Sequence, residues 1–236
     1  MTKNQNYTTR QEQISVFLGI SIQIISVVFA ARFIIDLGAR MLYSFIPQFS
    51  AGLGITVAAF GWLLFIRALA GVTSPVFGLL SDRYGRRTIM MASFLLLAAC
   101  GVGMALSRQW WSVMPLILSG LAVAAFVPAQ QAYISDRVTY EKRGRAMGSV
   151  EFAWSSSAII ALPLMGWMIE AYGWRTPFVF IALLSLCGAA IVWRYLPAAS
   201  ERQAHEPLTW RGIRKIVGKR NVMASMGVSF LLFAPP

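Results

Sequence analysis

Long apolar stretches without a formal charge recur along the chain, and they restrict the possible folds more than any other feature. Three of them cover residues 88–107, 152–169 and 176–193, and a fourth lies within residues 109–135. A helix needs about 17–25 apolar residues to cross the hydrocarbon core of a bilayer. Charged residues make up 13% of the chain, compared with about 25% in soluble domains. The pattern therefore predicts a bundle of membrane-spanning helices.

Two more crossings are expected although they contain charged residues. Residues 55–80 are interrupted only by Arg67, and we place the first crossing at residues 24–48, preceded by a segment along the cytoplasmic interface. Cytoplasmic loops are enriched in Lys and Arg. Sixteen of the 21 Lys and Arg residues fall on the side of the N-terminus, and two, Arg108 and Arg175, fall on the other. We therefore expect an all-α, multi-pass protein of the plasma (inner) membrane with six spans and a cytoplasmic N-terminus.

The excess of basic residues is explained mostly by this topology. The net charge is +12, but the basic residues lie in short clusters between apolar runs. Nucleic-acid binding requires a basic groove, often with stacking aromatic residues, so we expect none. Cys100 and Cys187 each lie inside an apolar run, and the chain has one His. These residues form no metal-binding or catalytic set, so we expect no metal, no cofactor and no enzyme activity.

An internal repeat relates the end of the second span to the end of the fifth. Residues 75–88 align with residues 163–176 at an offset of 88, and seven of the fourteen positions match in kind. The matched pairs are Pro75 with Pro163, Gly78 with Gly166, Asp82 with Glu170, Tyr84 with Tyr172, Gly85 with Gly173, Arg87 with Arg175, and Thr88 with Thr176. Because the repeat is three spans long, its copies must be inverted in the membrane. Inverted three-helix repeats are a hallmark of transporter folds.

The first copy of the repeat carries the most specific motif of the chain. Its sequence is Gly78-Leu-Leu-Ser-Asp82-Arg83-Tyr-Gly85-Arg86-Arg87. This resembles the signature loop of the major facilitator superfamily, G-x-L-a-D-r-x-G-r-r, which follows the second helix on the cytoplasmic side. Residues 143–148 and 173–178 also resemble the family where the fifth and sixth spans open. The resemblance implies a six-helix half-bundle built from two inverted three-helix repeats, followed by the start of a seventh helix.

The chemistry of the signature loop suits a conformational latch. Glycine permits close helix approach and tight turns, and an aspartate is favoured near a helix N-terminus. Asp136, at the end of the fourth span, is placed to pair with Arg86. The residues that we expect in the latch are Gly78, Asp82, Arg83, Gly85, Arg86, Arg87 and Asp136.

Two positions depart from the drug-efflux branch of this family. That branch usually shows G-P-x-x-G-G in the fifth span, where this chain has Leu162-Pro163-Leu-Met-Gly166-Trp167. It also tends to carry an Arg four residues before a Gly in the fourth span, where Leu116 precedes Gly120. The sequence therefore does not predict drug efflux.

Several charged and polar side chains fall at bilayer depth. Arg32, Asp36, Arg40 and Tyr43 share one face of the first helix. Charged groups at this depth usually face a polar cavity, so we expect a substrate or proton site near the midplane. Its candidate residues are Asp36, Arg40, Arg67, Gln130, Gln131 and Glu151. The alternative is a structural ion pair, for example Asp36 with Arg67. Arg32 is expected to extend to the cytoplasmic surface instead.

The resemblance also implies a division of the chain. Residues 1–197 are expected to form the six-helix domain, residues 198–220 a basic cytoplasmic linker, and residues 221–236 the start of a seventh helix too short to cross the bilayer. Transporters of this fold hold their substrate between two six-helix halves. We therefore expect that this chain alone does not transport. Either its C-terminal half is missing, which the partial seventh span favours, or two copies of the chain dimerise.

The implied function is secondary active transport of a small solute by alternating access. The coupling ion that we expect is the proton, and the implied partners are the solute, protons, the lipid bilayer and the second half. A membrane receptor or interaction protein that does not transport is the alternative. The sequence does not distinguish import from export.

Overall fold

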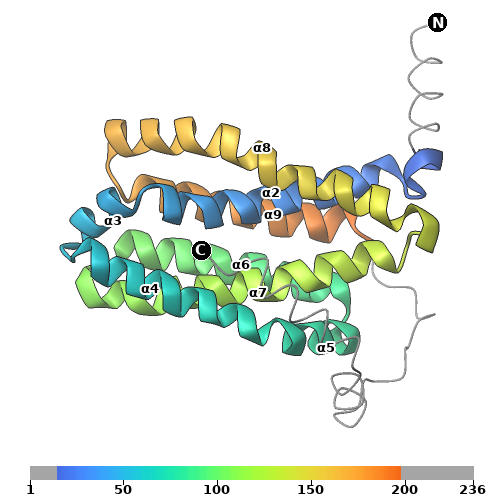
Figure 1. Cartoon of the computed structure of the whole chain (residues 1–236), viewed down its shortest axis with the longest axis horizontal. Helices are drawn as coiled ribbons and strands as arrows, with labels where there is room; N and C mark the ends of the chain where they lie inside the picture. Colours follow the sequence, from blue (N-terminus) through green and yellow to red (C-terminus); the bar gives the residue numbers. More distant parts are fainter. Residues whose placement is uncertain (1–14, 198–236) are drawn as a thin grey trace, which may run out of the picture. The chain divides into compact units, whose positions relative to one another are not determined.

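The described part of the chain, residues 15–197 of the computed structural model, consists of long helices that lie side by side (Figure 1). The α-helices are α2 (Ile22–Ser44), α3 (Ile46–Leu53), α4 (Val57–Leu69), α5 (Ser74–Tyr84), α6 (Arg86–Leu106), α7 (Val113–Ser135), α8 (Tyr140–Tyr172) and α9 (Thr176–Tyr195), with 3-10 turns η1 (Ala70–Thr73) and η2 (Gln109–Ser112). Six segments in this region are long and apolar enough to cross a bilayer. The predicted six spans are therefore confirmed. The expected linker and seventh helix lie outside the described residues.

Prolines change the first two crossings from what the sequence predicted. The first helix begins at Ile22 and ends at Ser44, and α3 restarts with a proline in its first turn. Pro47 has no amide hydrogen to continue the helical ladder, but it is well tolerated in a first turn. The second crossing is divided in the same way, because η1 separates α4 from α5 and Pro75 lies in the first turn of α5.

The helix packing has the twofold relation that the internal repeat predicted. Helix α2 packs against α8 and α9, while α7, its counterpart in the second repeat, packs against α4, α5 and α6. The first and fourth spans therefore have equivalent neighbours, because each packs against the second and third spans of the other repeat. Helices α6 and α9, the third spans of the two repeats, pack extensively against each other. The inverted repeat is thus expressed in the arrangement of the helices.

Small residues allow α6 and α9 to approach closely. A Cβ built on Gly101 of α6 would lie 2.7 Å from the carbonyl oxygen of Phe178 and 2.9 Å from the Cβ of Ala182. Close approach through small residues is a main source of helix association in membranes. Gly101 therefore sets the spacing between the two repeats.

We expect Gly101→Ala to destabilise the protein by about 1–3 kcal/mol, because the added methyl group forces α6 and α9 apart. Gly148→Ala is the matched control, since a Cβ at Gly148 in α8 meets nothing within 4 Å. The control should be neutral or slightly stabilising, because alanine favours a helix over glycine by about 1 kcal/mol. Thermal unfolding of the purified protein in detergent measures both effects. Equal unfolding temperatures for the two variants would contradict the packing argument.

Candidate functional site: a charged helix corner and a buried charge cluster

The first candidate site is the α5–α6 corner, which comprises residues 78–87. Gly85 links the two helices with a φ of 90°, a conformation that favours glycine. Helix α6 begins at the next residue, so Arg86 and Arg87 lie in its first turn. The corner therefore presents two guanidinium groups at one end of the bundle, beside the last turn of α5.

Arg86 makes most of the polar contacts of the corner. Its guanidinium forms an ion pair with Asp82, and its Nε lies 3.3 Å from an Asp136 carboxylate oxygen. Its Nη1 donates to Ser81 Oγ at 2.5 Å and to the Gly78 carbonyl at 3.5 Å. The predicted contact between Arg86 and Asp136 is therefore present. Asp82, whose side chain is 36% exposed, keeps an open side for another partner.

The other two arginines of the motif lie outside this network. Arg87 donates to the Trp193 carbonyl near the end of α9, so it ties the corner to the last span. Arg83 is exposed, and its guanidinium lies 5.5 Å from the centre of the neighbouring Tyr84 ring. Arg83 contacts no carboxylate among residues 15–197, unlike Arg86.

The second copy of the repeat forms a corner at the opposite end, with different chemistry. Gly173 also has a φ of 90°, and Trp174 follows it as Arg86 follows Gly85. The Trp174 ring packs over Gly52 of α3, where an added Cβ would lie 2.4 Å from the ring. It also meets the Phe178 ring edge-on at 6.3 Å between centroids. The two corners therefore share a backbone conformation, but one is joined by ion pairs and the other by aromatic packing.

The second candidate site, the Arg32 cluster, consists of Arg32, Asp36, Gln130 and Glu151. Arg32 Nε lies 2.9 Å from Asp36 Oδ2 and its Nη2 lies 3.3 Å from Glu151 Oε2. Its Nη1 donates to Gln130 Oε1 at 3.2 Å. Arg32 and Asp36 are 8% and 3% exposed, whereas the Glu151 side chain is 45% exposed. One guanidinium thus bridges a buried carboxylate and an open one.

The expectation that Arg32 extends to the cytoplasmic surface was wrong. Two carboxylates and an amide satisfy the guanidinium within the bundle, and such pairing is the usual condition for a charge at bilayer depth. The alternative pairing of Asp36 with Arg67 is also absent, because Asp36 is occupied by Arg32.

Arg40 and Gln131 do not join the Arg32 cluster. Arg40 turns toward α8, where it donates to the Trp154 carbonyl at 2.9 Å and to Ser157 Oγ at 3.2 Å. Its guanidinium also lies 3.9 Å from the centre of the Trp154 ring. Gln131 is exposed on α7, next to the buried Gln130. Only one of the two adjacent glutamines therefore faces the charged residues.

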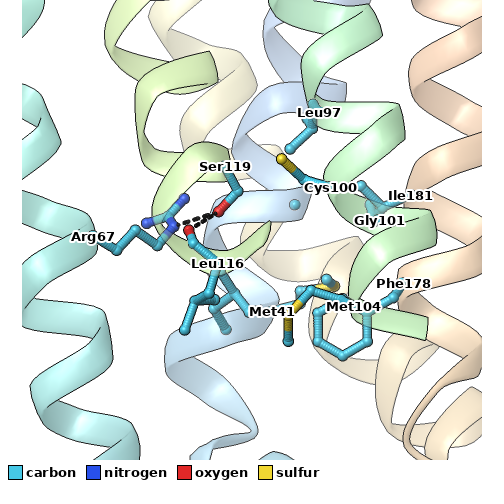
Figure 2. Close-up of a pocket in the computed structure, with 12 residues that line it drawn as sticks. Met41, Arg67, Leu97, Cys100, Gly101, Met104, Leu116, Ser119, Phe178 and Ile181 are labelled. Carbon is cyan, nitrogen blue, oxygen red and sulfur yellow. Dashed lines mark hydrogen bonds between the residues drawn. The ribbon is translucent and has the colours of Figure 1, made fainter. Parts of the chain in front are cut away.

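Arg67 lies in a separate place, between α4 and α7. It is 6% exposed, and its Nε donates to Ser119 Oγ at 3.0 Å. The Tyr43 side chain lies next to the same guanidinium. Figure 2 shows the guanidinium reaching Ser119 at one side of a small pocket, whose other walls are largely apolar. The sequence predicted Arg67 but not its partner, because nothing distinguishes Ser119 from other serines of the spans.

Arg67 lies beside Leu116, the position in the fourth span at which this chain differs from the drug-efflux branch of the family. The pocket is lined by Arg67 together with Leu116, which stands where the drug-efflux branch tends to carry an arginine. A Cβ on Gly120 would lie 2.4 Å from the Arg67 carbonyl oxygen. This chain therefore brings a guanidinium to that part of α7 from the neighbouring helix α4. Among the described residues, no set of three His, Cys, Asp or Glu side chains is placed to hold a metal ion.

Known proteins with similar sequences are membrane transporters. The chain is 31% identical over 162 residues to "Multidrug resistance protein 2" of Bacillus subtilis, covering 66% of this chain and 40% of that protein. It is 31% identical over 168 residues to human "Solute carrier family 67 member A1", covering 68% of this chain and 39% of that protein. The chain thus matches about two fifths of the length of these relatives.

Solved structures share the fold. A peptide transporter POT solved with alafosfalin superimposes with a TM-score of 0.67 at 17% identity, covering 89% of this chain and 46% of the other. The xylose transporter XylE of E. coli gives 0.61 at 18% identity, covering 91% of this chain and 56% of the other. The family model of the Major Facilitator Superfamily matches residues 28–235. This match, the six-span bundle and the shared fold show that the chain belongs to the Major Facilitator Superfamily.

Proposed function

We propose that the chain is the N-terminal half of a secondary transporter that moves a small solute by alternating access, driven by protons. The Arg32 cluster is the observation that carries this proposal. It holds two carboxylates on one guanidinium, so its ionised form has one excess negative charge. One proton added to either carboxylate makes the cluster neutral. The open Glu151 side chain gives the proton a route to the buried Asp36.

In this proposal the α5–α6 corner is the conformational latch. Alternating access requires contacts that exist in one state and break in the other. The ion pairs of Arg86 with Asp82 and Asp136 join α5, α6 and α7, and they lie partly open at the end of the bundle. The exposed side of Asp82 suits a helix N-terminus of a second six-helix unit, where an anion is favoured.

A second six-helix unit completes the transporter in this proposal. Residues 1–197 form the first half, residues 198–220 the linker, and residues 221–236 begin the next helix. The second unit is either further chain, as the length of the relatives favours, or a second copy of this chain. Asp36, Arg40, Arg67, Gln130, Gln131 and Glu151 then line or support the cavity between the units.

We also propose that the N-terminus is cytoplasmic and that the membrane is the plasma (inner) membrane. The distribution of Lys and Arg supports this orientation. In a cysteine-free background, single cysteines at positions 108 and 175 should react with an impermeant reagent added to intact cells, and a cysteine at position 143 should not. Labelling at position 143 from outside would reverse the orientation.

The transport proposal is tested in proteoliposomes that contain the complete transporter, an imposed pH gradient and a panel of candidate solutes. We expect saturable solute movement that follows the gradient. Glu151→Gln should remove the dependence on the gradient, because the cluster then carries no excess negative charge. Glu141→Gln is the matched control, since Glu141 is an exposed acid in the first turn of the same helix. If Glu151→Gln still follows the gradient, coupling at this cluster is wrong; ligand binding without solute movement would favour a receptor.

A further inference from the structure

The charges within the spans are unevenly paired. Arg32 takes both carboxylates at this depth, Asp36 and Glu151. Arg40 and Arg67 have neutral partners among the described residues: a carbonyl and hydroxyl groups. Arg40 is partly exposed, whereas Arg67 is 94% buried, at 6% exposure. Arg67 is therefore a deeply buried cation with no counter-charge in the part of the chain that the structure describes.

The groups around Arg67 are arranged to accept an anion as a further partner. Ser119 Oγ accepts from Arg67 Nε at 3.0 Å and donates to the Leu116 carbonyl at 2.6 Å. These bonds fix the guanidinium but supply no negative charge. Arginine has five N–H donors, more than Ser119 and Tyr43 together engage. The Tyr43 side chain lies next to the same group and is likewise uncharged. A buried charge left without a counter-charge is expensive, so this arrangement favours a bound anion.

The pocket beside Arg67 limits the size of that anion. Its volume is about 20 Å³, which is room for roughly one water molecule. Leu116, Phe178 and Ile181 form part of its wall (Figure 2). Such apolar walls strengthen a charge interaction by lowering the local dielectric. A halide ion, which is only slightly larger than water, fits this description, as does the end of a carboxylate whose remainder lies outside.

We propose that Arg67 and Ser119 form a binding site for one small monovalent anionic group, separate from the Arg32 cluster. The site lies between α2, α4 and α7, so an anion there joins three spans of the bundle. The inference does not depend on proton coupling, because anion binding is measured without transport.

The test measures the thermal unfolding midpoint of the full-length protein, purified in detergent. Chloride, bromide or formate replaces a bulky organic sulfonate, whose tetrahedral head group is larger than a carboxylate and than the pocket, at constant ionic strength. A ligand that binds only the folded state raises the midpoint in a saturable way. We expect such a shift for chloride and bromide. A shift with formate alone assigns the site to the carboxylate end of a larger solute. The absence of a saturable shift with all three anions would overturn the proposal. A carboxylate of the second unit that already pairs with Arg67 would give this result, and the proposal would then be wrong.

Variants of Arg67 and Ser119 locate the site, with an exposed arginine elsewhere as the control. Arg67→Met should abolish the shift, and Ser119→Ala should raise the anion concentration at half effect by about tenfold, as expected for a lost hydrogen bond to a charged group. Arg108→Gln removes an exposed cation elsewhere and should leave the shift unchanged. If Arg67→Met does not fold, Arg67→Lys keeps the charge, loses the planar fork and should weaken binding. Full retention of the shift in Arg67→Met or Arg67→Lys would place the anion elsewhere and refute the assignment.

Discussion

Replacing Arg86 by Gln in the complete transporter is expected to reduce solute transport by about 100-fold. Arg86 is the cation of both ion pairs in the α5–α6 corner. Losing two partly exposed ion pairs of up to about 1 kcal/mol each, together with the hydrogen bonds to Ser81 and the Gly78 carbonyl at about 0.5–1.5 kcal/mol each, shifts the balance between conformational states by about two orders of magnitude. A transporter held mostly in one state completes its cycle slowly. Uptake or efflux by whole cells that express each variant at matched membrane abundance measures the effect.

Arg83→Gln is the control for this experiment. It removes the same type of side chain from the same corner, but Arg83 is exposed and its described contact is with the Tyr84 ring. We expect Arg83→Gln to keep most of its transport, and Asp82→Asn to lose it as Arg86→Gln does, with normal insertion and abundance. Similar rates for all three variants would show that the ion pairs do not control the cycle.

Arg32→Gln is expected to destabilise the folded protein by about 3–5 kcal/mol, the range found when one partner of a buried ion pair is removed. The Asp36 side chain, which is 4% exposed, then remains as an uncompensated buried charge. The Glu151 side chain is 45% exposed, so water can solvate its carboxylate once the contact with Arg32 is gone. Glu151 therefore contributes little to the loss of stability. Chemical or thermal unfolding in detergent measures the change.

The double variant Arg32→Gln with Asp36→Asn separates this cause from a general packing defect. It removes both charges and should recover most of the stability that Arg32→Gln loses. Arg40→Gln is a control of the same residue type on the same helix, because Arg40 binds a carbonyl and a hydroxyl group and leaves no carboxylate stranded. A double variant no more stable than Arg32→Gln would show that the ion pair is not the source of the loss.

The spans and the α5–α6 corner were predictable because their signals are local. Hydropathy determines which stretches cross the bilayer, and the positions of glycine and arginine around residue 85 determine where one helix ends and the next begins. The contact of Arg86 with Asp136 followed from both residues lying at the same end of neighbouring spans. The breaks at Pro47 and Pro75 were less predictable, since a proline can bend, cap or interrupt a helix depending on its surroundings.

The partners of the buried charges depend on how each helix is rotated about its axis. Arg32 meets Glu151 across 119 positions of the chain, and Arg67 meets Ser119 across 52. A single sequence shows which residues lie at similar depth, but not which of them face each other. Asp36 was therefore assigned two possible roles, and Arg32 was placed at the surface although it is the centre of the cluster.

The two glycine corners have different consequences for how the protein responds to ionic strength. At 0.15 M salt, charges separated by more than about 8 Å are largely screened, and partly exposed ion pairs weaken further as salt rises. The contacts of Arg86 with Asp82 and Asp136 belong to this class, since their side chains are between 18% and 36% exposed. The packing of Trp174 over Gly52 and Phe178 does not depend on formal charges. Salt therefore weakens the ion pairs at one end of the bundle more than the aromatic packing at the other, although both ends derive from the same repeated sequence.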